Sequence, residues 1–252
     1  MDVIGDIAIV RFTGPARTPM RRLAKALLGE VPNVRSVFQQ EGGVEGEYRL
    51  RRLRHLAGAR RTLTVHRENG CSFKVDVRRC YFSPRLSTER LRVAVAVKRK
   101  ERVLNMFAGV GPFSIVIAKR SGARVTSCEL NRYACRLHEE NVKLNKVASL
   151  VEVVNCDASE LKGTVKGKFD RILMPHPSAA NRFLPDALSV AKSEGVIHYY
   201  RHMPGRNEEE ARENLGLELD ELLPKSATYR IRRVREVGPR WLELVADITP
   251  RR

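Results

Sequence analysis

The run RVLNMFAGVGPFSIVI at residues 102–117 constrains the fold more than any other part of this 252-residue sequence. Its first half is apolar and β-branched, which predicts a buried parallel strand. Gly109 and Gly111 follow, and Pro112 then begins an amphipathic helix at a position where its missing N–H is tolerated. The glycines allow a tight turn and the close approach of a ligand to backbone N–H groups. The run therefore predicts the nucleotide-binding turn of a doubly wound α/β domain.

Two acidic residues follow the next two predicted strands, which span residues 124–128 and 151–155. Glu129 follows Gly109 at the spacing expected of a ribose-binding carboxylate, and Asp157 lies where it would meet an adenine amine. Ser114 replaces the third glycine of a dinucleotide fingerprint, and the sequence shows no Walker lysine. The pair therefore favours S-adenosylmethionine (AdoMet), an adenosine without phosphates, over NAD or ATP. Taken singly, each acid would more often be an ordinary polar loop residue.

The charge is strongly basic and unevenly distributed. The net charge is +18, and residues 1–100 carry 22 Lys and Arg residues against nine Asp and Glu residues. Six arginines crowd residues 49–61, which favours contact with the phosphates of a nucleic acid over a merely charged surface. We expect an RNA-binding surface in this part of the chain.

The composition limits the class of protein and the compartment in which we expect it. The 42% hydrophobic content supports a real core, and no apolar run is long enough to span a membrane. The acidic first residues predict no signal peptide, and the five cysteines contain no C-x-x-C pair. We expect reduced, buried cysteines, no metal site and a cytoplasmic protein.

The order of predicted elements gives two parts. Residues 1–80 read as a small basic α+β domain, with strands at 3–12, 34–39, 61–67 and 71–77 and a helix capped at Thr18-Pro19. Asn69-Gly70 predicts a tight hairpin. Residues 81–252 read as alternating strands and helices that end in two antiparallel strands, 227–237 and 240–248. This ending is typical of a class I, Rossmann-like methyltransferase sheet.

Two long strings carry a family resemblance. YFSPRLSTER at residues 81–90, followed by NMFAGVGPFSI, closely resembles the archaeal and eukaryotic-type tRNA guanine-37 N1-methyltransferases. HRENG at 66–70, the asparagine pair Asn141 and Asn145, and GVIHYY at 195–200 are also similar to that family. These enzymes use AdoMet and are related to the wybutosine-pathway aminocarboxypropyl transferases. The resemblance runs from about residue 60 to the C-terminus.

The resemblance implies roles for particular residues. N1 of guanine is protonated at neutral pH, so methylation needs a base for the proton and a donor for charge on O6. By resemblance Glu89 is the base, Arg67 the O6 donor, and Arg90 a partner of the methionine carboxylate. The full expected AdoMet site is Tyr81, Arg90, Phe107, Gly109, Gly111, Glu129, Leu130, Asp157 and Ala158. The expected substrate contacts are Asn69, Arg85, Pro175 and Pro177.

Three departures qualify the resemblance. Pro175-His176-Pro177 replaces the family's Asn-Leu-Pro, which removes an asparagine that contacts the target guanine. Asn105 replaces an aspartate near the cofactor. Counting back from FSPRLSTER, we expect no room for the extra N-terminal module of many members. We expect a monomeric enzyme that binds the anticodon stem-loop of tRNA, and not DNA, and makes N1-methylguanosine at position 37. The alternatives are a wybutosine-type transferase or methyltransferase on a modified guanosine there, or a tRNA-binding pseudoenzyme.

Overall fold

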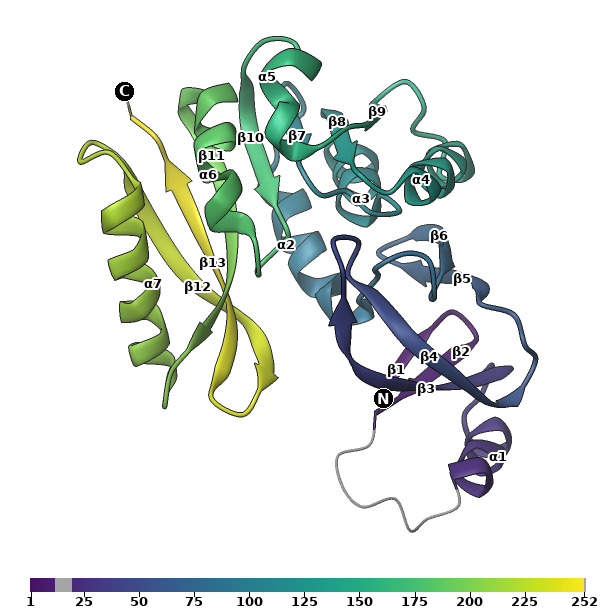
Figure 1. The fold of residues 1–252 in the computed structure, drawn as a ribbon. Coiled ribbons are helices and arrows are strands. Elements are labelled where there is room, and N and C mark those ends of the chain that lie inside the picture. The colour runs from purple at the N-terminus through teal and green to yellow at the C-terminus, as the bar shows by residue number, and fades with distance from the viewer. Residues whose placement is uncertain (12–19, 252) are drawn as a thin grey trace.

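A computed structural model describes residues 1–11 and 20–251, and the predicted helix cap at Thr18-Pro19 lies outside these ranges. The N-terminal sheet has four strands, in the order β1 (Asp2–Ile4), β2 (Ile7–Val10), β3 (Ser36–Glu45) and β4 (Leu50–Gly58). Helix α1 (Met20–Glu30) buries Ala24 against this sheet (Figure 1). The α+β character predicted for the N-terminal part is confirmed.

A separate hairpin follows, made of β5 (Leu63–Glu68) and β6 (Cys71–Asp76). Its turn residues Asn69 and Gly70 have φ angles of 48° and 70°, as the predicted Asn-Gly turn requires. The side-chain amides of Asn141 and Asn145 bond the main chain of β6 at Lys74 and Ser72, with distances between 2.7 and 3.1 Å. These hydrogen bonds attach the β5–β6 hairpin to Asn141 and Asn145, and so to the rest of the molecule.

The second large sheet has seven strands in the order β12-β13-β11-β10-β7-β8-β9. Its parallel strands are β7 (Arg102–Asn105), β8 (Arg124–Glu129), β9 (Val151–Asn155), β10 (Phe169–Met174) and β11 (Ala191–Pro204). The antiparallel strands β12 (Thr228–Gly238) and β13 (Trp241–Thr249) complete it. This is the predicted class I sheet with its antiparallel ending.

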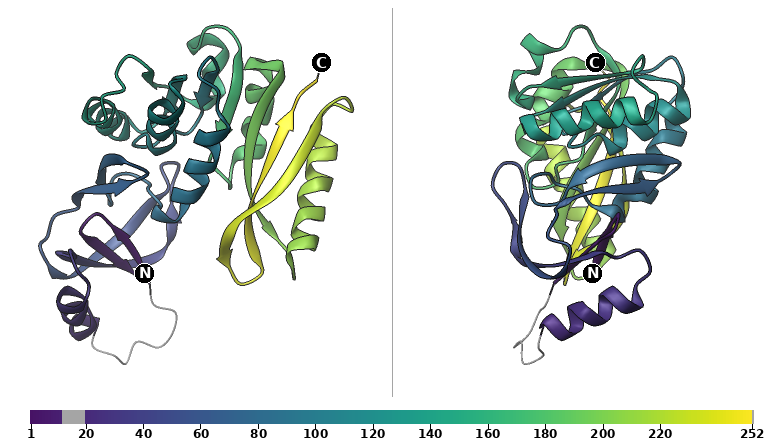
Figure 2. Two further views of the ribbon diagram at one scale, coloured as in Figure 1. Left: turned by 180° about the vertical axis from the view of Figure 1, so that it is seen from behind. Right: turned by 90° about the vertical axis from the view of Figure 1, so that its right-hand side faces the viewer.

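Helices cover both faces of this sheet. One apolar core joins the sheet to α2 (Ser87–Ala96), α3 (Pro112–Ser121) and α4 (Arg132–Leu144). Another joins its opposite face to α5 (Leu161–Thr164), α6 (Ala180–Val190) and α7 (Glu208–Leu222). Short 3-10 turns, η1 (Pro84–Leu86) and η2 (Ala158–Glu160), precede α2 and α5. Figure 2 shows the N-terminal sheet and α1 lying below α4 and the β7–β9 part of the seven-stranded sheet, while the β12–β13 hairpin reaches down to the level of the N-terminal sheet in the left view.

The structure differs from the sequence prediction at three strands. The single strand expected at 3–12 is divided by a turn at Gly5, whose φ is 56°. The arginine-rich β4 was not predicted, and β11 is longer than the expected 195–200. Among the described residues, no helix is both long enough and apolar enough to cross a membrane. The domain division at residue 80 stays a prediction.

One expectation about the cysteines is wrong. Cys128 and Cys156 form a disulfide, with their Cα atoms 5.7 Å apart. The reason is topological, because β8 and β9 are parallel neighbours whose carboxyl ends bring the two residues side by side. Cys71, Cys80 and Cys135 are free and buried, as expected. The argument from reduced cysteines to a cytoplasmic protein therefore no longer holds.

Candidate active site

The glycine turn forms as predicted and holds the first acidic residue. Gly109 and Gly111 have φ angles of 55° and 89°, in the left-handed region. The Glu129 carboxylate accepts hydrogen bonds from the backbone N–H of Gly109 at 2.7 Å and of Asn131 at 2.8 Å. A Cβ atom at Gly111 would lie 2.2 Å from the buried His138 ring, so only glycine fits there. The turn is therefore fixed by the packing of Gly111 against His138 and by the hydrogen bond from Gly109 to the Glu129 carboxylate.

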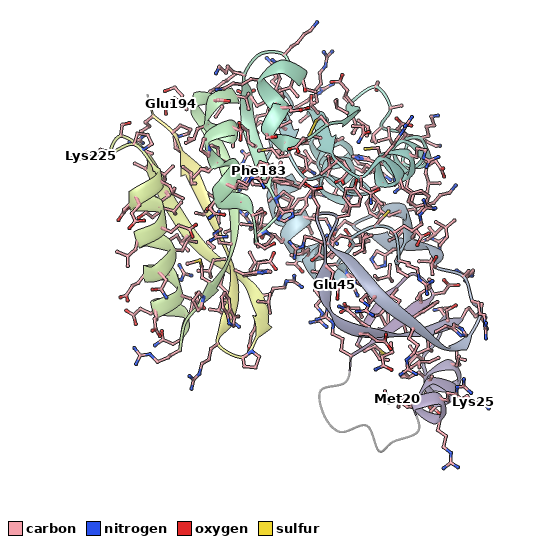
Figure 3. The ribbon with its side chains drawn as sticks, in the orientation of Figure 1. Met20, Lys25, Glu45, Phe183, Glu194 and Lys225 are labelled. Carbon is pink, nitrogen blue, oxygen red and sulfur yellow. A yellow bond between two sulfur atoms is a disulfide. The ribbon has the colours of Figure 1, made fainter. Side chains whose placement is uncertain are left out.

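A cavity of about 470 Å³ opens beside this turn, which is the size range of small-ligand sites. Figure 3 labels Phe183 on α6 and Glu45 at the end of β3, the two elements that flank it. Of the expected site residues, those that line the cavity are Tyr81, Arg90, Phe107, Gly109, Glu129, Leu130, Asp157, Ala158 and Pro175. The structure thus brings most of the expected AdoMet site together in one place.

The two acidic residues differ in their surroundings. Burial raises the pKa of Glu129, although the backbone hydrogen bonds oppose that shift. Asp157 lies near the surface and accepts hydrogen bonds from the Ser159 N–H and hydroxyl, both at 2.8 Å, which lower its pKa. Two carboxylates at adjacent strand ends suit a ligand with a vicinal diol and an amine.

Arg90 and Asn105 are engaged within the protein. The Arg90 guanidinium donates to both carboxylate oxygens of Glu68, one at 2.6 Å, and to the Ser83 carbonyl at 3.0 Å. Arg90 therefore lines the cavity as part of a buried ion pair. Asn105 donates to the Ser114 hydroxyl at 3.1 Å, beneath the glycine turn. This neutral contact explains how the chain accommodates an asparagine where the family has an aspartate.

The two expected catalytic residues do not line the cavity. Glu89 is buried, and its carboxylate accepts two hydrogen bonds from Arg92, at 2.7 and 2.8 Å, and one from the Tyr200 hydroxyl at 2.6 Å. Arg67 is exposed, on the face of β5 opposite to Glu68. Their roles remain predictions.

Four other expected site residues also lie outside the lining. Gly111 packs on His138. Asn69 donates to the Ser87 carbonyl at 3.0 Å, and Arg85 pairs with Asp2 at 2.7 Å. The Pro177 carbonyl accepts from Arg201 at 2.8 Å. These contacts position the segments around the cavity, and any contact of these residues with a substrate remains a prediction.

Sequence reasoning missed two parts of the cavity wall. One consists of His176 and Phe183, whose ring centroids lie 5.1 and 5.2 Å from that of the predicted site residue Phe107. Burial and the nearby charge of Arg49 lower the pKa of His176 to about 4, so this ring is neutral near pH 7. The other is the turn between β3 and β4, which contributes Gly46, Glu47, Tyr48 and Arg49. The sequence pattern predicts Arg49 only as part of a phosphate-binding surface.

Known proteins resemble this chain over 80–98% of its length. Trm5b of Pyrococcus abyssi, a tRNA (guanine(37)-N(1))-methyltransferase, is 43% identical over 81% of this chain, which covers 60% of that protein. Taw21 of Saccharolobus solfataricus, a tRNA 4-demethylwyosine(37)-methyltransferase, is 33% identical, with 98% and 92% covered. A Pyrococcus horikoshii tRNA(Phe) (4-demethylwyosine(37)-C(7)) aminocarboxypropyltransferase is 36% identical, with 80% and 70% covered.

A solved structure and two family models agree with these relatives. The complex of aTrm5 with tRNALeu superposes with a TM-score of 0.86 at 33% identity, covering 98% of this chain and 70% of that one. A TYW2 N-terminal domain model matches residues 2–62, and the TRM5/TYW2 methyltransferase domain model matches residues 64–219. The chain spans about 60% of the length of the Trm5b proteins it matches. Its sequence, sheet order and glycine turn together show that it belongs to the TRM5/TYW2 methyltransferase family.

Proposed function

We propose that this protein transfers the methyl group of AdoMet to N1 of guanosine 37 in tRNA. The observation that carries the proposal is the cavity, which joins the glycine turn, the two strand-end carboxylates and the YFSPRLSTER segment. Glu129 would accept hydrogen bonds from the ribose hydroxyls and Asp157 from the adenine amine. Bound AdoMet supplies an electrophilic methyl group, and the protein supplies orientation.

Glu89 and Arg67 would complete the chemistry. Glu89 would take the N1 proton and Arg67 would stabilise charge on O6. Glu89 adjoins Arg90 in α2, and Arg90 lines the cavity, whereas the Glu89 carboxylate contacts Arg92 and Tyr200. The bonds from Arg92 and Tyr200 hold it there. The proposal therefore requires that bound tRNA bring these groups and the base together.

Two observations favour a second candidate, methylation of a modified guanosine at the same position. Pro175 lines the cavity in place of the family's asparagine, so that contact with an unmodified guanine is missing. The Saccharolobus relative that this chain matches end to end is named for 4-demethylwyosine. An aminocarboxypropyl transfer and a pseudoenzyme are the further outcomes that an experiment must separate.

Labelled AdoMet separates these candidates. The protein is incubated with tRNA transcripts bearing G or A at position 37 and with tRNA bearing 4-demethylwyosine, using AdoMet labelled in the methyl or the carboxyl group. We expect methyl label only in N1-methylguanosine, and only with G37. Methyl label in the modified base alone would establish the second candidate, and carboxyl label would establish aminocarboxypropyl transfer. AdoMet binding with no transfer to any of these substrates would indicate a pseudoenzyme.

We further propose a cytoplasmic monomer that binds the anticodon stem-loop through exposed arginines and lysines of the N-terminal part, without affinity for DNA. Some arginines of the N-terminal part are paired within the protein, so they are not available to bind RNA phosphates. Arg51 is buried and bonds Asp2 at 3.2 Å and the Phe82 carbonyl at 2.9 Å, and Arg54 pairs with Glu41 at 2.8 Å. Arg51 thus fixes β4 to the YFSPRLSTER segment, which forms part of the cavity wall.

A further inference from the structure

The GVIHYY string at residues 195–200 carries part of the family resemblance, yet its residues lie outside the cavity lining. It forms the middle of β11, where His198 and Tyr200 are both buried. Because one residue separates the two in a strand, they lie on the same face of the sheet. On that face the Tyr200 hydroxyl donates to Glu89 of α2 at 2.6 Å. The string therefore lies beside the residue expected to act as the base.

Asp247 of β13 is the cross-strand partner of His198. The His198 Nδ1 atom lies 2.6 Å from one Asp247 carboxylate oxygen, and its Nε2 atom lies 2.8 Å from Nη1 of Arg171. An arginine can only donate, so Nε2 accepts and Nδ1 carries the hydrogen that Asp247 accepts. Burial and the charge of Arg171 lower the pKa of His198, in keeping with a neutral ring. His198 therefore orients the Asp247 carboxylate without neutralising it.

The Arg92 guanidinium lies between two carboxylates. Its Nε and Nη2 atoms donate to the two oxygens of Glu89 at 2.8 and 2.7 Å, and its Nη1 atom lies 3.4 Å from the second oxygen of Asp247. Only 26% of the Arg92 side chain is exposed, against 9% for Glu89 and 16% for Asp247. Arg92 thus has one close carboxylate partner and a second within reach, in surroundings that hold little water.

The proposed reaction removes the charge of the closer partner. Glu89 takes the N1 proton as the methyl group bonds to N1, and the AdoMet sulfonium is left as a neutral thioether. The carboxylate of Glu89 is then a neutral acid, so Arg92 loses the negative charge with which it pairs. A largely buried cation without a counter-ion is costly. A second carboxylate already in place removes that cost.

We propose that Asp247 is a positioning residue for the base, which receives the Arg92 guanidinium while Glu89 holds the proton. The proposal rests on the proposed function, in which Glu89 is the base. Before the transfer, the Asp247 charge offsets part of the attraction between Arg92 and Glu89, which keeps Glu89 a stronger base. The cation is paired both before and after the proton moves.

The groups around Glu89 and Asp247 stay the same in the variants that test this. Those that face them are Arg92 from α2, Arg171 from β10, His198 and Tyr200 from β11, Arg230 and Arg232 from β12, and Glu243 from β13. Arginines keep their charge throughout. Burial lowers the pKa of His198 and raises that of Tyr200, so neither changes charge near neutral pH. Against the effect of burial, contacts with His202 and Arg235 lower the pKa of Glu243. A displaced acid limb in the reaction rate therefore follows the charge that a variant removes.

The test measures the single-turnover rate of methyl transfer to a tRNA transcript with G37 between pH 5 and 9, and the Kd for AdoMet. Asp247→Asn removes the negative charge and keeps an acceptor oxygen, and Arg92→Gln removes the guanidinium. Asp170→Asn is the matched control, because Asp170 also pairs with a cation on the neighbouring strand, Lys192 at 2.7 Å. Asp170 lies outside this network and outside the cavity lining.

We expect Asp247→Asn to lower the plateau rate roughly three- to tenfold and to move the acid limb to lower pH by about 0.5–1 unit, because Arg92 then acts on Glu89 alone. Arg92→Gln should also slow transfer, but its acid limb should move to higher pH, because Glu89 loses a neighbouring cation. Asp247→Glu restores the charge and should return the limb to about its wild-type position. The AdoMet Kd should stay within about threefold in every variant, and Asp170→Asn should match the wild type throughout.

Two results would overturn the assignment. One is a slower Asp247→Asn whose acid limb has not moved, which would make Asp247 a structural residue only. The other is a displacement of the limb in the same direction in Asp247→Asn and Arg92→Gln. If Asp247→Asn does not fold, Asp247→Ser, which is smaller and keeps a hydroxyl acceptor, decides through the same limb. Failure of the proposed function is distinguishable, because the wild type would then transfer no label to G37 at any pH.

Discussion

At the scale of single residues, the carboxylates of Glu129 and Asp157 show how burial and hydrogen bonding shift the pKa of similar groups in opposite directions. Glu129 is buried, so its pKa is raised, whereas the hydrogen bonds from Ser159 lower the pKa of Asp157. Acidification neutralises Glu129 first, and a neutral carboxyl has lost part of its accepting capacity.

This difference predicts the pH dependence of AdoMet binding. As pH falls, affinity should drop at a higher pH than an ordinary glutamate would cause, because the raised pKa of Glu129 is crossed first. Glu129→Gln should weaken binding roughly tenfold at pH 7.5 and remove this acid limb. Asp157→Asn should weaken binding at pH 7.5 and keep the limb. Calorimetry between pH 5 and 7.5 measures both, and an acid limb that survives in Glu129→Gln would contradict the assignment.

Glu89 is expected to be the general base, but its side chain does not line the cavity. It is buried outside the cavity lining and is fixed by Arg92 and Tyr200. If it is the base, Glu89→Gln should lower kcat at least about a hundredfold while the Kd for AdoMet stays within threefold. Tyr200→Phe removes only the hydrogen bond that orients the carboxylate and should lower kcat by about three- to tenfold. Turnover at the wild-type rate in Glu89→Gln would exclude Glu89 as the base.

At the scale of elements, the conformation of the glycine turn depends on its packing against His138 of α4. Gly111→Ala should destabilise the fold by at least about 2 kcal/mol, since it combines a left-handed φ with a clash against His138. Gly109→Ala is the matched control, because its φ is also positive but the nearest atom would be 3.6 Å away. Urea denaturation measures the free energy of unfolding of each variant. Equal losses in the two would show that His138 does not matter.

The elements also show what a sequence pattern can and cannot predict. Strands β8 and β9 and the hairpin at Asn69-Gly70 follow from β-branched runs and turn residues, which act locally. Strand β4 was missed because LRRLRHLAG is rich in arginine and does not alternate as a strand does. Its pairing with β3 and the ion pair between Arg51 and Asp2 stabilise it, and both connect positions far apart in the chain.

In the candidate site, too, the sequence predicts the residues whose positions depend on local structure and not those placed by contacts between distant segments. The spacing of Gly109, Glu129 and Asp157 is a property of two consecutive βαβ units, and these residues do line a single cavity. Arg49 was beyond prediction as a site residue, because its place depends on how the first sheet lies against the second. The pairing of Arg90 with Glu68 likewise depends on the docking of the β5–β6 hairpin.

At the scale of the whole molecule, the disulfide crosslinks the two strand ends that carry the site carboxylates. Cys128 and Cys156 are 28 residues apart, and closing a loop of this length stabilises a fold by about 3–4 kcal/mol in the chain-entropy model. Reduction should lower the free energy of unfolding by about that amount, and Cys128→Ser with Cys156→Ser should show no further effect of reductant. Cys135→Ser, at a buried free thiol, should keep the response. Five titratable thiols in the unfolded, unreduced protein would contradict the crosslink.

The cavity wall extends in sequence from Val44, at the end of the first sheet, to Phe183 on α6. A chain synthesised from its N-terminus thus makes the β3–β4 turn well before the surfaces against which that turn must lie. The nascent protein has no complete cavity until α6 has left the ribosome, and aromatic side chains such as Tyr48 and Tyr81 lack their final neighbours until then. A ligand that binds only the finished cavity stabilises the released protein and gives no help during translation.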